Sequence, residues 1–472
     1  DGTEPADAIA KLTSAISTLR NDEGPVLIRL RVPRLSGHSG QDTQAYKDEL
    51  FIRDEQMRDP LPKLQSYLVP DLLSVREWER IETSAKEQVA NALQAARNRP
   101  EPDTSTLYHH RYVETNTQTG SEQLSLFGGA ACEGYSAPQG SETPNPEPAR
   151  VNLLTAVRRT LEHELKVNKR LLVFGEDVGP KGGVHAATLG LQDAFGDKRV
   201  FDTSLSEEGI IGRAVGMAYA GLTPVAEIQF RKYADPAQEQ LTDCGTIRWR
   251  TNNQFAAPIV VRMPGGHSKC GDPWHSMSDE VMFAHMVGWQ VAYPSNAEDG
   301  VGLLRSALRS NNPTMFFEHR NLLDAPSARR PYPGDDFIVP FGKAKFLQTG
   351  NDVTVITWGA MVERILEASQ QISTSVEILD LRTISPWDRE AVLTSVEKTG
   401  RALIVHEDTL TAGFGAEISA VISSEAFLSL KAPVERLAPR DIPMPYNVGL
   451  LQAALPSVEL IADKILELAE FE

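Results

Sequence analysis

A carboxylate at the junction of a strand and a helix is the strongest chemical signal in the sequence. Residues 199–202 predict a short strand, and a helix begins within a few residues of it, at Glu207. Ligands of open α/β sheets bind at the carboxyl ends of the strands, so Glu207 is in a position to share a proton with a ligand. The alternative is an ordinary acidic residue favoured by the helix dipole, and Glu208 fits that interpretation better.

Three glycines follow along the same predicted helix, at Gly209, Gly212 and Gly216. Each glycine costs a helix about 1 kcal/mol relative to alanine, so their repetition needs a reason. We expect another backbone to approach that face of the helix closely. The alternative is a helix that simply packs tightly against its own domain.

Two histidines stand in turn-rich segments where they are able to serve a reaction. His275 follows a glycine-rich stretch, and His38 lies in the pattern Arg34-x-x-Gly-His-Ser. Histidine titrates near neutral pH and therefore suits proton transfer. Most of the ten histidines are expected to be structural or on the surface, and His267 and His406 are assigned to that class.

Composition excludes several classes of partner. The 472 residues carry 47 Lys and Arg against 64 Asp and Glu, a net charge of −17. Nucleic acid and anionic lipid surfaces both require a positive protein surface, so neither is expected as a partner. No membrane span is expected, because no run of 18 apolar residues occurs. The three cysteines are widely spaced and lack a CxxC pair, which favours a reducing, cytoplasmic location without zinc or disulfides.

The pattern of apolar residues divides the chain into four regions. Residues 1–105 predict a helix over 6–19, a strand over 25–31 and helices within 66–97. Residues 106–150 are rich in Gly, Ser, Thr, Pro and Gln in their later part and predict a flexible linker. Strands and helices alternate over 151–335 and again over 336–472, as in mostly parallel α/β sheets covered on both faces.

The beginning of the chain predicts a longer polypeptide. There is no initiator Met, and a helix and a strand follow almost at once. A single helix and strand cannot bury their own faces, so we expect that a preceding part is missing. The alternative is a short helical arm on a complete protein.

A family resemblance rests on several separate segments. The spacing of Glu207, Gly212 and Gly216 resembles the signature of the pyrimidine-binding domain in thiamin diphosphate enzymes. Further segments, in the same order along the chain, resemble the β subunit of the decarboxylating first component of 2-oxo acid dehydrogenase complexes: residues 225–233, 271–276, 379–388 and 411–417. Residues 1–5, 24–28, 34–39 and the helices to 102 resemble the last third of its α subunit.

The resemblance implies a fold and a set of roles. The expected fold is a transketolase-like, thiamin diphosphate-binding parallel-sheet domain, then a transketolase C-terminal-like α/β domain, with an α-subunit remnant in front. It implies that Glu207 activates the cofactor and that Leu205, Gln229 and Tyr233 contact its rings. It also implies that Arg34 contacts the diphosphate, and that His38 and His275 serve the substrate or the lipoyl step. The GDG motif that binds Mg²⁺ is absent, so the metal ligands are expected in the missing part.

The implied reaction is oxidative decarboxylation of a 2-oxo acid, with transfer of the acyl group to the lipoyl domain of a partner acyltransferase. A homo-oligomer is expected. A branched-chain substrate is favoured by residues 228–237, with pyruvate or acetoin dehydrogenase as near alternatives. A transketolase-like carboligase and a non-catalytic assembly subunit remain open, and the fragment is expected to be inactive alone.

Overall fold

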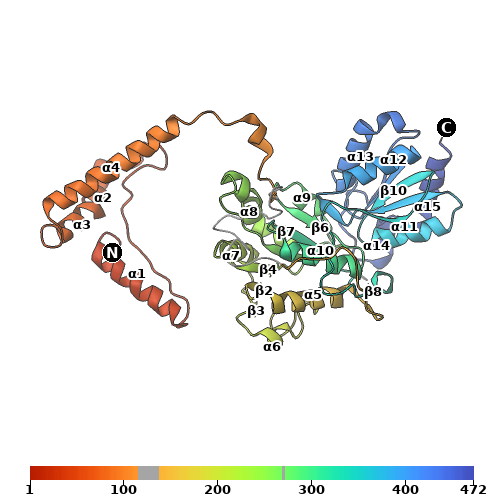
Figure 1. Ribbon diagram of the computed structural model, residues 1–472, viewed down its shortest axis with the longest axis horizontal. Coiled ribbons are helices and arrows are strands. Elements are labelled where there is room, and N and C mark those ends of the chain that lie inside the picture. Colours follow the sequence, from red (N-terminus) through yellow and green to blue (C-terminus); the bar gives the residue numbers. More distant parts are fainter. Residues whose placement is uncertain (115–137, 268–271, 472) are drawn as a thin grey trace. The chain divides into compact units, whose positions relative to one another are not determined.

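The computed structural model describes residues 1–114, 138–267 and 272–471. They form two compact units, Asp1–Thr106 and Leu107–Glu472. Each unit has its own helices and contacts (Figure 1). No helix among the described residues is both long and apolar enough to cross a membrane.

The first unit is helical. Its helices are α1 (Pro5–Arg20), α2 (Glu49–Met57), α3 (Pro60–Leu68) and α4 (Val75–Arg97). Ser74 and Glu77 form a reciprocal capping box that fixes the start of α4. The strand expected over 25–31 is wrong, because that segment is extended but pairs with no sheet. An apolar run makes a strand only where another strand supplies hydrogen bonds.

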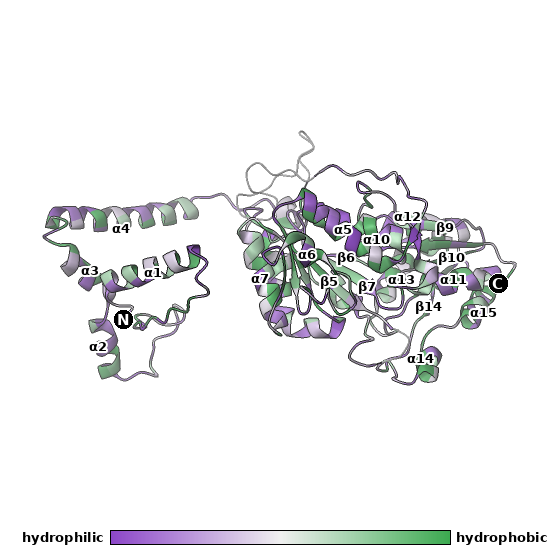
Figure 2. Cartoon of the chain, turned by 90° about the horizontal axis from the view of Figure 1, so that it is seen from below, coloured by the Kyte–Doolittle hydropathy of each residue, from purple (hydrophilic) through white to green (hydrophobic). Residues whose placement is uncertain are grey.

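Apolar side chains of this unit remain largely exposed. Among residues 1–106, all of which are described, Ala15 is the one buried hydrophobic side chain. Large side chains along α1 and α4 are exposed by 40% or more, among them Ile9, Leu12, Ile81 and Val89. Figure 2 shows green and purple stretches alternating along both helices.

A seven-stranded sheet forms the first half of the second unit. Its strand order is β12-β6-β7-β5-β4-β2-β3, and all neighbours are parallel except β12 and β6. The strands are β2 (Leu171–Gly175), β3 (Val200–Asp202), β4 (Thr223–Glu227), β5 (Val260–Gly265), β6 (Gln290–Ala292), β7 (Thr314–His319) and β12 (Thr383–Ser385).

Helices cover both faces of this sheet (Figure 1). They are α5 (Leu153–Val167), α6 (Leu191–Phe195), α7 (Glu207–Tyr219), α8 (Gln238–Arg250), α9 (Glu280–Ala284) and α10 (Ala297–Arg309). Successive strand residues point to opposite faces, so Val173 packs into the core under α5 and α10. Its neighbour Phe174 packs into the core under α7 and α8.

A five-stranded sheet of order β14-β13-β10-β11-β9 forms the second half. Its strands are β9 (Lys345–Gln348), β10 (Val353–Thr357), β11 (Val376–Asp380), β13 (Ala402–Val405) and β14 (Glu435–Leu437). Its helices are α11 (Met361–Gln370), α12 (Arg389–Thr399), α13 (Phe414–Glu425), α14 (Val448–Ala454) and α15 (Val458–Ala469). The predicted fold class is confirmed: two mostly parallel α/β sheets follow one another.

The two halves share a strand. β12 comes from the second half by sequence, yet it pairs antiparallel with β6 at the edge of the first sheet. Hydrogen bonds between β12 and β6 therefore cross the domain boundary that was predicted at residue 335. A pair of two-residue strands, β1 (Arg150–Val151) and β8 (Arg330–Pro331), joins the beginning and the end of the first half.

The described ends of the predicted linker are attached to the second unit. The Val113 N–H donates to Asn312 Oδ1 at 2.7 Å. On the other side, Ser141 exchanges backbone hydrogen bonds with the segment 336–338. These contacts hold residues near both ends in place, whereas 115–137, the central part of that prediction, lies outside the described residues.

Candidate active site

Three neighbouring strands bring the candidate residues to one edge of the sheet. β3, β2 and β4 are adjacent and parallel, so their carboxyl ends meet. Glu176 follows β2, Glu207 begins α7 after β3, and Gln229 follows β4. The sequence-based expectation for the placement of Glu207, at a strand-to-helix junction, matches the structure.

Two carboxyl groups interact at this edge. The Glu207 side chain is partly exposed. Burial first, and the charge of Glu207 second, raise the pKa of Glu176. Glu176 Oε1 is buried and has no hydrogen-bond partner among the described residues. The edge of the sheet therefore holds one side chain open to a ligand, Glu207, and a second carboxyl, Glu176, whose pKa is raised above its ordinary value.

Leu205 and Gln229 differ in their exposure. Leu205 is 82% exposed, which makes it one of the most exposed apolar side chains in the second unit. Gln229 is buried, and its Oε1 has no partner in the part of the chain that the structure describes. A buried amide oxygen without a donor is costly unless something else supplies one. Both side chains therefore suit a ligand that brings an apolar face and a hydrogen-bond donor.

Tyr233 and His275 meet directly. Tyr233 lies in the short helix η3 (Arg231–Ala237), and its hydroxyl is 3.0 Å from His275 Nε2. The Phe230 ring packs on His275 with centroids 4.2 Å apart, and its other contacts include the His185 ring at 5.6 Å. Burial, then the charges of Arg320 and Arg262, lower the pKa of His185 to about 4. His185 is therefore neutral at physiological pH.

A buried ion triad supports the end of β4. Arg262 donates from Nη1 to Glu227 at 2.8 Å and from Nε to Glu318 at 2.7 Å. A third bond joins its Nη2 to the other Glu318 oxygen at 3.0 Å. All three residues are at most 3% exposed. The triad ties β4, β5 and β7 together, and its Glu227 lies two residues before Gln229.

Arg34 and His38 belong to the first unit, where Asp42 organises their turn. Asp42 Oδ2 accepts from the His38 backbone N–H at 2.7 Å and lies 3.5 Å from the Arg34 guanidinium. The backbone N–H groups of His38 and Gln44 lower the pKa of Asp42. Both the Arg34 and His38 side chains are exposed. The structure thus brings these two together. On the second unit it brings Tyr233 and His275 together, and α7, which begins at Glu207, contacts the short helix η3 that carries Tyr233.

Glycines of α7 do not meet another backbone within the described residues. A Cβ at Gly212 would contact only Gln240 Cγ, at 3.7 Å, and a Cβ at Gly216 would contact nothing within 4 Å. The close approach expected for this helix face is therefore not made by the described part of this chain.

A buried cluster elsewhere has the composition of a metal site. Ligand atoms of His267, His319 and Glu407 lie within 4.8 Å of one another. The Asn321 N–H, however, donates to His319 Nδ1 at 3.2 Å, so the ring proton lies on Nε2, which is 2.7 Å from Glu407. An Nε2 that carries a proton offers no lone pair to a metal. This cluster therefore fits a hydrogen-bonded contact better than a metal centre.

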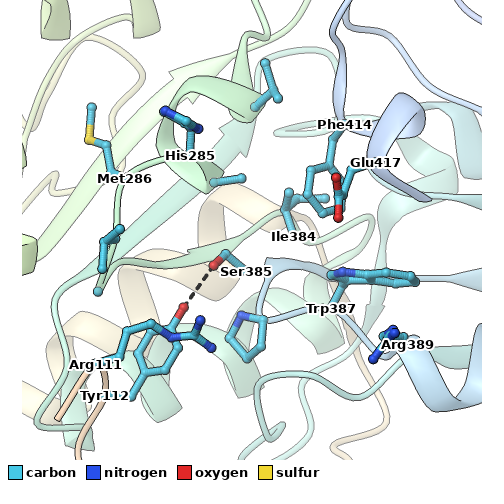
Figure 3. A pocket seen from close by; sticks show the side chains of 15 residues that line it. Arg111, Tyr112, His285, Met286, Ile384, Ser385, Trp387, Arg389, Phe414 and Glu417 are labelled. Atoms are coloured by element: carbon cyan, nitrogen blue, oxygen red, sulfur yellow. Dashed lines mark hydrogen bonds between the residues drawn. The ribbon is translucent and has the colours of Figure 1, made fainter. Parts of the chain in front are cut away.

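A pocket of about 520 Å³ lies beside β12, away from the candidate residues. Figure 3 shows Tyr112 at its wall, with its hydroxyl 3.1 Å from Ser385 Oγ. Trp387, Phe414 and Met286 supply much of its apolar surface. None of the predicted site residues lines it, so it is not the candidate active site.

Some residues near the site were not predicted from the sequence. Glu176 and His185 had usable signals, because a carboxylate directly after a strand and a histidine in a glycine-rich loop both occur at ligand sites. Asp272, three residues before His275, is also near the imidazole. Arg262 lies inside an apolar strand, and its pairing with two glutamates depends on strand order. Only the fold supplies that information.

Comparison with known families covers most of the chain. Residues 1–105 match the dehydrogenase E1 component, 149–326 match the pyrimidine-binding domain of transketolase, and 342–461 match the transketolase C-terminal domain. Among solved structures, an inactive β4 tetramer of a split-gene transketolase aligns with a TM-score of 0.55 and 19% identity. It covers 68% of this chain and 99% of that one, and it supports the fold alone.

Curated relatives are β subunits of two dehydrogenases. The 2-oxoisovalerate dehydrogenase β subunit of Bacillus subtilis (strain 168) is 39% identical over 326 residues, 68% of this chain and 99% of the relative. The pyruvate dehydrogenase E1 β subunit of Staphylococcus aureus (strain Mu50 / ATCC 700699) is 38% identical over 327 residues, 68% and 100% of the two chains. The chain therefore belongs to the family of E1 components of 2-oxo acid dehydrogenases, with an α-type segment and a β-type part in one polypeptide.

Proposed function

We propose that the chain takes part in the oxidative decarboxylation of a branched-chain 2-oxo acid with thiamin diphosphate, and in transfer of the acyl group to a lipoyl group of a partner acyltransferase. The observation that carries the proposal is the placement of Glu207 at the start of α7, on the same edge of the sheet as the unpartnered Gln229 oxygen, in the part of the chain that matches a pyrimidine-binding domain. Pyruvate is the second candidate substrate, because both kinds of β subunit are similarly related to this chain.

The side chains at the sheet edge fit the pyrimidine end of the cofactor. Leu205 offers an apolar surface, Gln229 offers an unused acceptor, and Glu207 offers a carboxylate open to a ligand. When bound, thiamin diphosphate supplies the electron sink that decarboxylation of a 2-oxo acid requires. Glu207 would hold or release a proton at a pyrimidine ring nitrogen. Burial and the charge of Glu207 raise the pKa of the neighbouring Glu176, so its carboxyl gives up a proton less readily than an ordinary glutamate does.

Tyr233 and His275 would serve the substrate side. Their contact leaves the His275 ring fixed between a hydroxyl and the Phe230 face. A histidine held in this way is able to deliver a proton to a carbonyl oxygen or to a lipoyl sulfur. Neutral His185, whose ring also contacts Phe230, adds no competing charge at neutral pH.

The first unit would contribute to the phosphate side. We propose that Arg34 pairs with diphosphate oxygens and that His38 serves the substrate or lipoyl step, since both are exposed on one organised turn. We assign the Mg²⁺ ligands to residues outside this sequence, because it carries no GDG motif. We further propose a homo-oligomer that works in the cytoplasm with its acyltransferase.

Substitution of Glu207 tests this function. In the enzyme assembled with its partner components, Glu207→Gln should lower kcat at least a hundredfold, because proton transfer by a positioned group contributes about 10²–10⁴-fold. Glu208→Gln is the matched control, since Glu208 is exposed and its carboxylate accepts from its neighbour Ser206 at 3.0 Å. The assay follows reduction of an artificial electron acceptor by 3-methyl-2-oxobutanoate and by pyruvate.

Other outcomes separate the alternatives. Equal turnover of Glu207→Gln and Glu208→Gln would show that Glu207 is not the activating carboxylate. Turnover of sugar phosphates without any lipoyl acceptor would favour a transketolase-like carboligase. If Glu207→Gln leaves the turnover of the assembled enzyme unchanged and a partner chain carries all the activity, this chain is an assembly subunit.

A further inference from the structure

The His275 imidazole is held on both of its nitrogen atoms. Its Nε2 is 3.0 Å from the Tyr233 hydroxyl, and its Nδ1 is 3.3 Å from Asp272 Oδ2. The Phe230 ring covers one face, and the Arg320 guanidinium donates to the His275 carbonyl oxygen. Backbone and ring are therefore fixed together, and the ring has a carboxylate at one end and a hydroxyl at the other.

Asp272 is itself fixed by its surroundings. Its Oδ1 accepts from the Trp274 N–H at 2.8 Å and from the His275 N–H at 3.3 Å. Its own N–H donates to Oγ of the fully buried Ser276 at 3.1 Å. These bonds occupy Oδ1 and leave Oδ2 for the imidazole. Partial burial acts to raise the pKa of Asp272, but the Trp274 N–H and the His275 ring bring it below its ordinary value, so the group is a carboxylate at neutral pH.

We propose that Asp272 is a positioning residue for His275: its Oδ2 keeps a proton on Nδ1 and thereby turns Nε2 toward Tyr233 and the reacting end of the site. The inference rests on the proposed function, since it gives His275 its chemical state within that site. Nothing in the resemblance to other E1 components assigns a role to this residue.

The chemistry follows from the two nitrogens of histidine. A neutral ring carries one proton, and a carboxylate beside Nδ1 favours its placement there. Nε2 then has a lone pair that accepts from the Tyr233 O–H. When the ring is protonated, both nitrogens donate, and Asp272 stabilises the cation. A proton delivered by His275 leaves from Nε2, and the ring that remains keeps its Nδ1 proton. A carboxylate that fixes a histidine tautomer has the same effect in hydrolytic triads.

The Asp272→Asn variant distinguishes a role in orienting the His275 ring from a role in shaping the turn. Asparagine retains an acceptor oxygen for the Trp274 and His275 N–H groups and is favoured in such turns. It removes only the carboxylate opposite Nδ1. Asp335→Asn is the matched control, because Asp335 lies 3.4 Å from His163 Nδ1 in the same kind of pair, far from the site by sequence and function.

Two readouts test the proposal in the assembled enzyme. In ¹⁵N spectra of histidine-labelled protein, His275 should carry its proton on Nδ1 in the wild type and should lose that preference in Asp272→Asn. Turnover should fall at least tenfold in kcat with KM changed less than twofold, within the range of a general acid or base. In a His275→Ala background, Asp272→Asn should have no further effect, because the two residues act as one unit. Asp335→Asn should change neither readout at His275.

Results against the proposal are equally specific. If Asp272→Asn retains both the Nδ1 proton and wild-type kcat, Asp272 only shapes the turn, and the proposal is wrong. The same holds if Asp272→Asn lowers kcat as much in the His275→Ala background as in the wild type. The nuclear magnetic resonance readout needs no turnover. A wild type inactive on every 2-oxo acid would therefore refute the proposed function, while the spectra would still decide the Asp272–His275 contact.

Discussion

Glu280 should make the folded protein less stable as the pH rises, and replacing it should remove that dependence. Glu280 begins α9 and is fully buried. Its Oε1 accepts from Trp358 Nε1 at 2.7 Å, whereas Oε2 has no partner among the described residues. Burial first, and the charge of Asp408 second, raise the pKa of Glu280 to about 8 from 4.5. The carboxyl is therefore protonated at pH 5 in the folded protein.

The sign follows from proton binding. Between pH 4.5 and 8 the folded state binds more protons at Glu280 than the unfolded state does, so the free energy of unfolding decreases as the pH rises. The two pKa values imply a loss of about 3–4 kcal/mol between pH 5 and pH 8, at about 1.4 kcal/mol per unit. His406 acts in the opposite direction: burial lowers its pKa to about 4, so its contribution is lost as the pH falls below 6.5.

Comparison of Glu280→Gln with the wild type isolates the Glu280 contribution. Glutamine keeps the acceptor for Trp358 and cannot ionise, so its stability should lie within about 1 kcal/mol of the wild type at pH 5. At pH 8 the variant should be more stable by about 3 kcal/mol. Glu397→Gln, an exposed change on α12, is the control and should run parallel to the wild type.

The assay is denaturant unfolding at pH 5, 6.5 and 8, at constant ionic strength and one protein concentration. A fixed concentration matters because assembly would stabilise the folded state by mass action. If the difference in unfolding free energy between Glu280→Gln and the wild type is the same at pH 5 and pH 8, Glu280 does not titrate as its surroundings require. The reasoning from burial would then be refuted.

Two further changes test long-range contacts of the second unit. Arg262→Met should lower the free energy of unfolding by about 3–5 kcal/mol, because it leaves two buried carboxylates without a cation. Adding Glu227→Gln and Glu318→Gln should restore most of that loss. If Arg262→Met alone is within about 1 kcal/mol of the wild type, the triad does not stabilise the fold as argued. Tyr112→Phe removes contacts with Trp289 O and Ser385 Oγ, and it should cost about 1 kcal/mol and speed amide exchange in residues 107–114. Unchanged exchange there would show that Tyr112 does not anchor the segment.

Local patterns predicted the parts of the site that depend on local structure. The junction at Glu207 is visible because a short apolar strand and a helix start are both encoded within a few residues. Gln229 and Tyr233 were placed by resemblance, and the structure puts both just after β4. The roles of these residues remain predictions, since position alone does not assign chemistry.

Long-range pairing was beyond the reach of such patterns. The segment 25–31 has the apolar residues of a strand, but nothing in a local pattern says whether a second strand will pair with it. The sequence did not predict β12 as the edge strand of the first sheet. It has only three residues of ordinary composition, and nothing local indicates that they pair with β6. Tyr112 lies in a region of linker composition. Its hydroxyl nevertheless contacts Trp289 O and Ser385 Oγ, which are far away along the chain.

Buried polar groups of the first sheet are of two kinds, those that are paired and those that are not. Buried charges of the sheet are paired in one ion triad, in which Arg262 contacts Glu227 and Glu318. Gln229 and Glu176 instead each keep a buried oxygen that has no partner among the described residues. A protein gains no stability from buried polar atoms without partners. The two unpartnered oxygens just after β2 and β4 are therefore available to a ligand that donates hydrogen bonds.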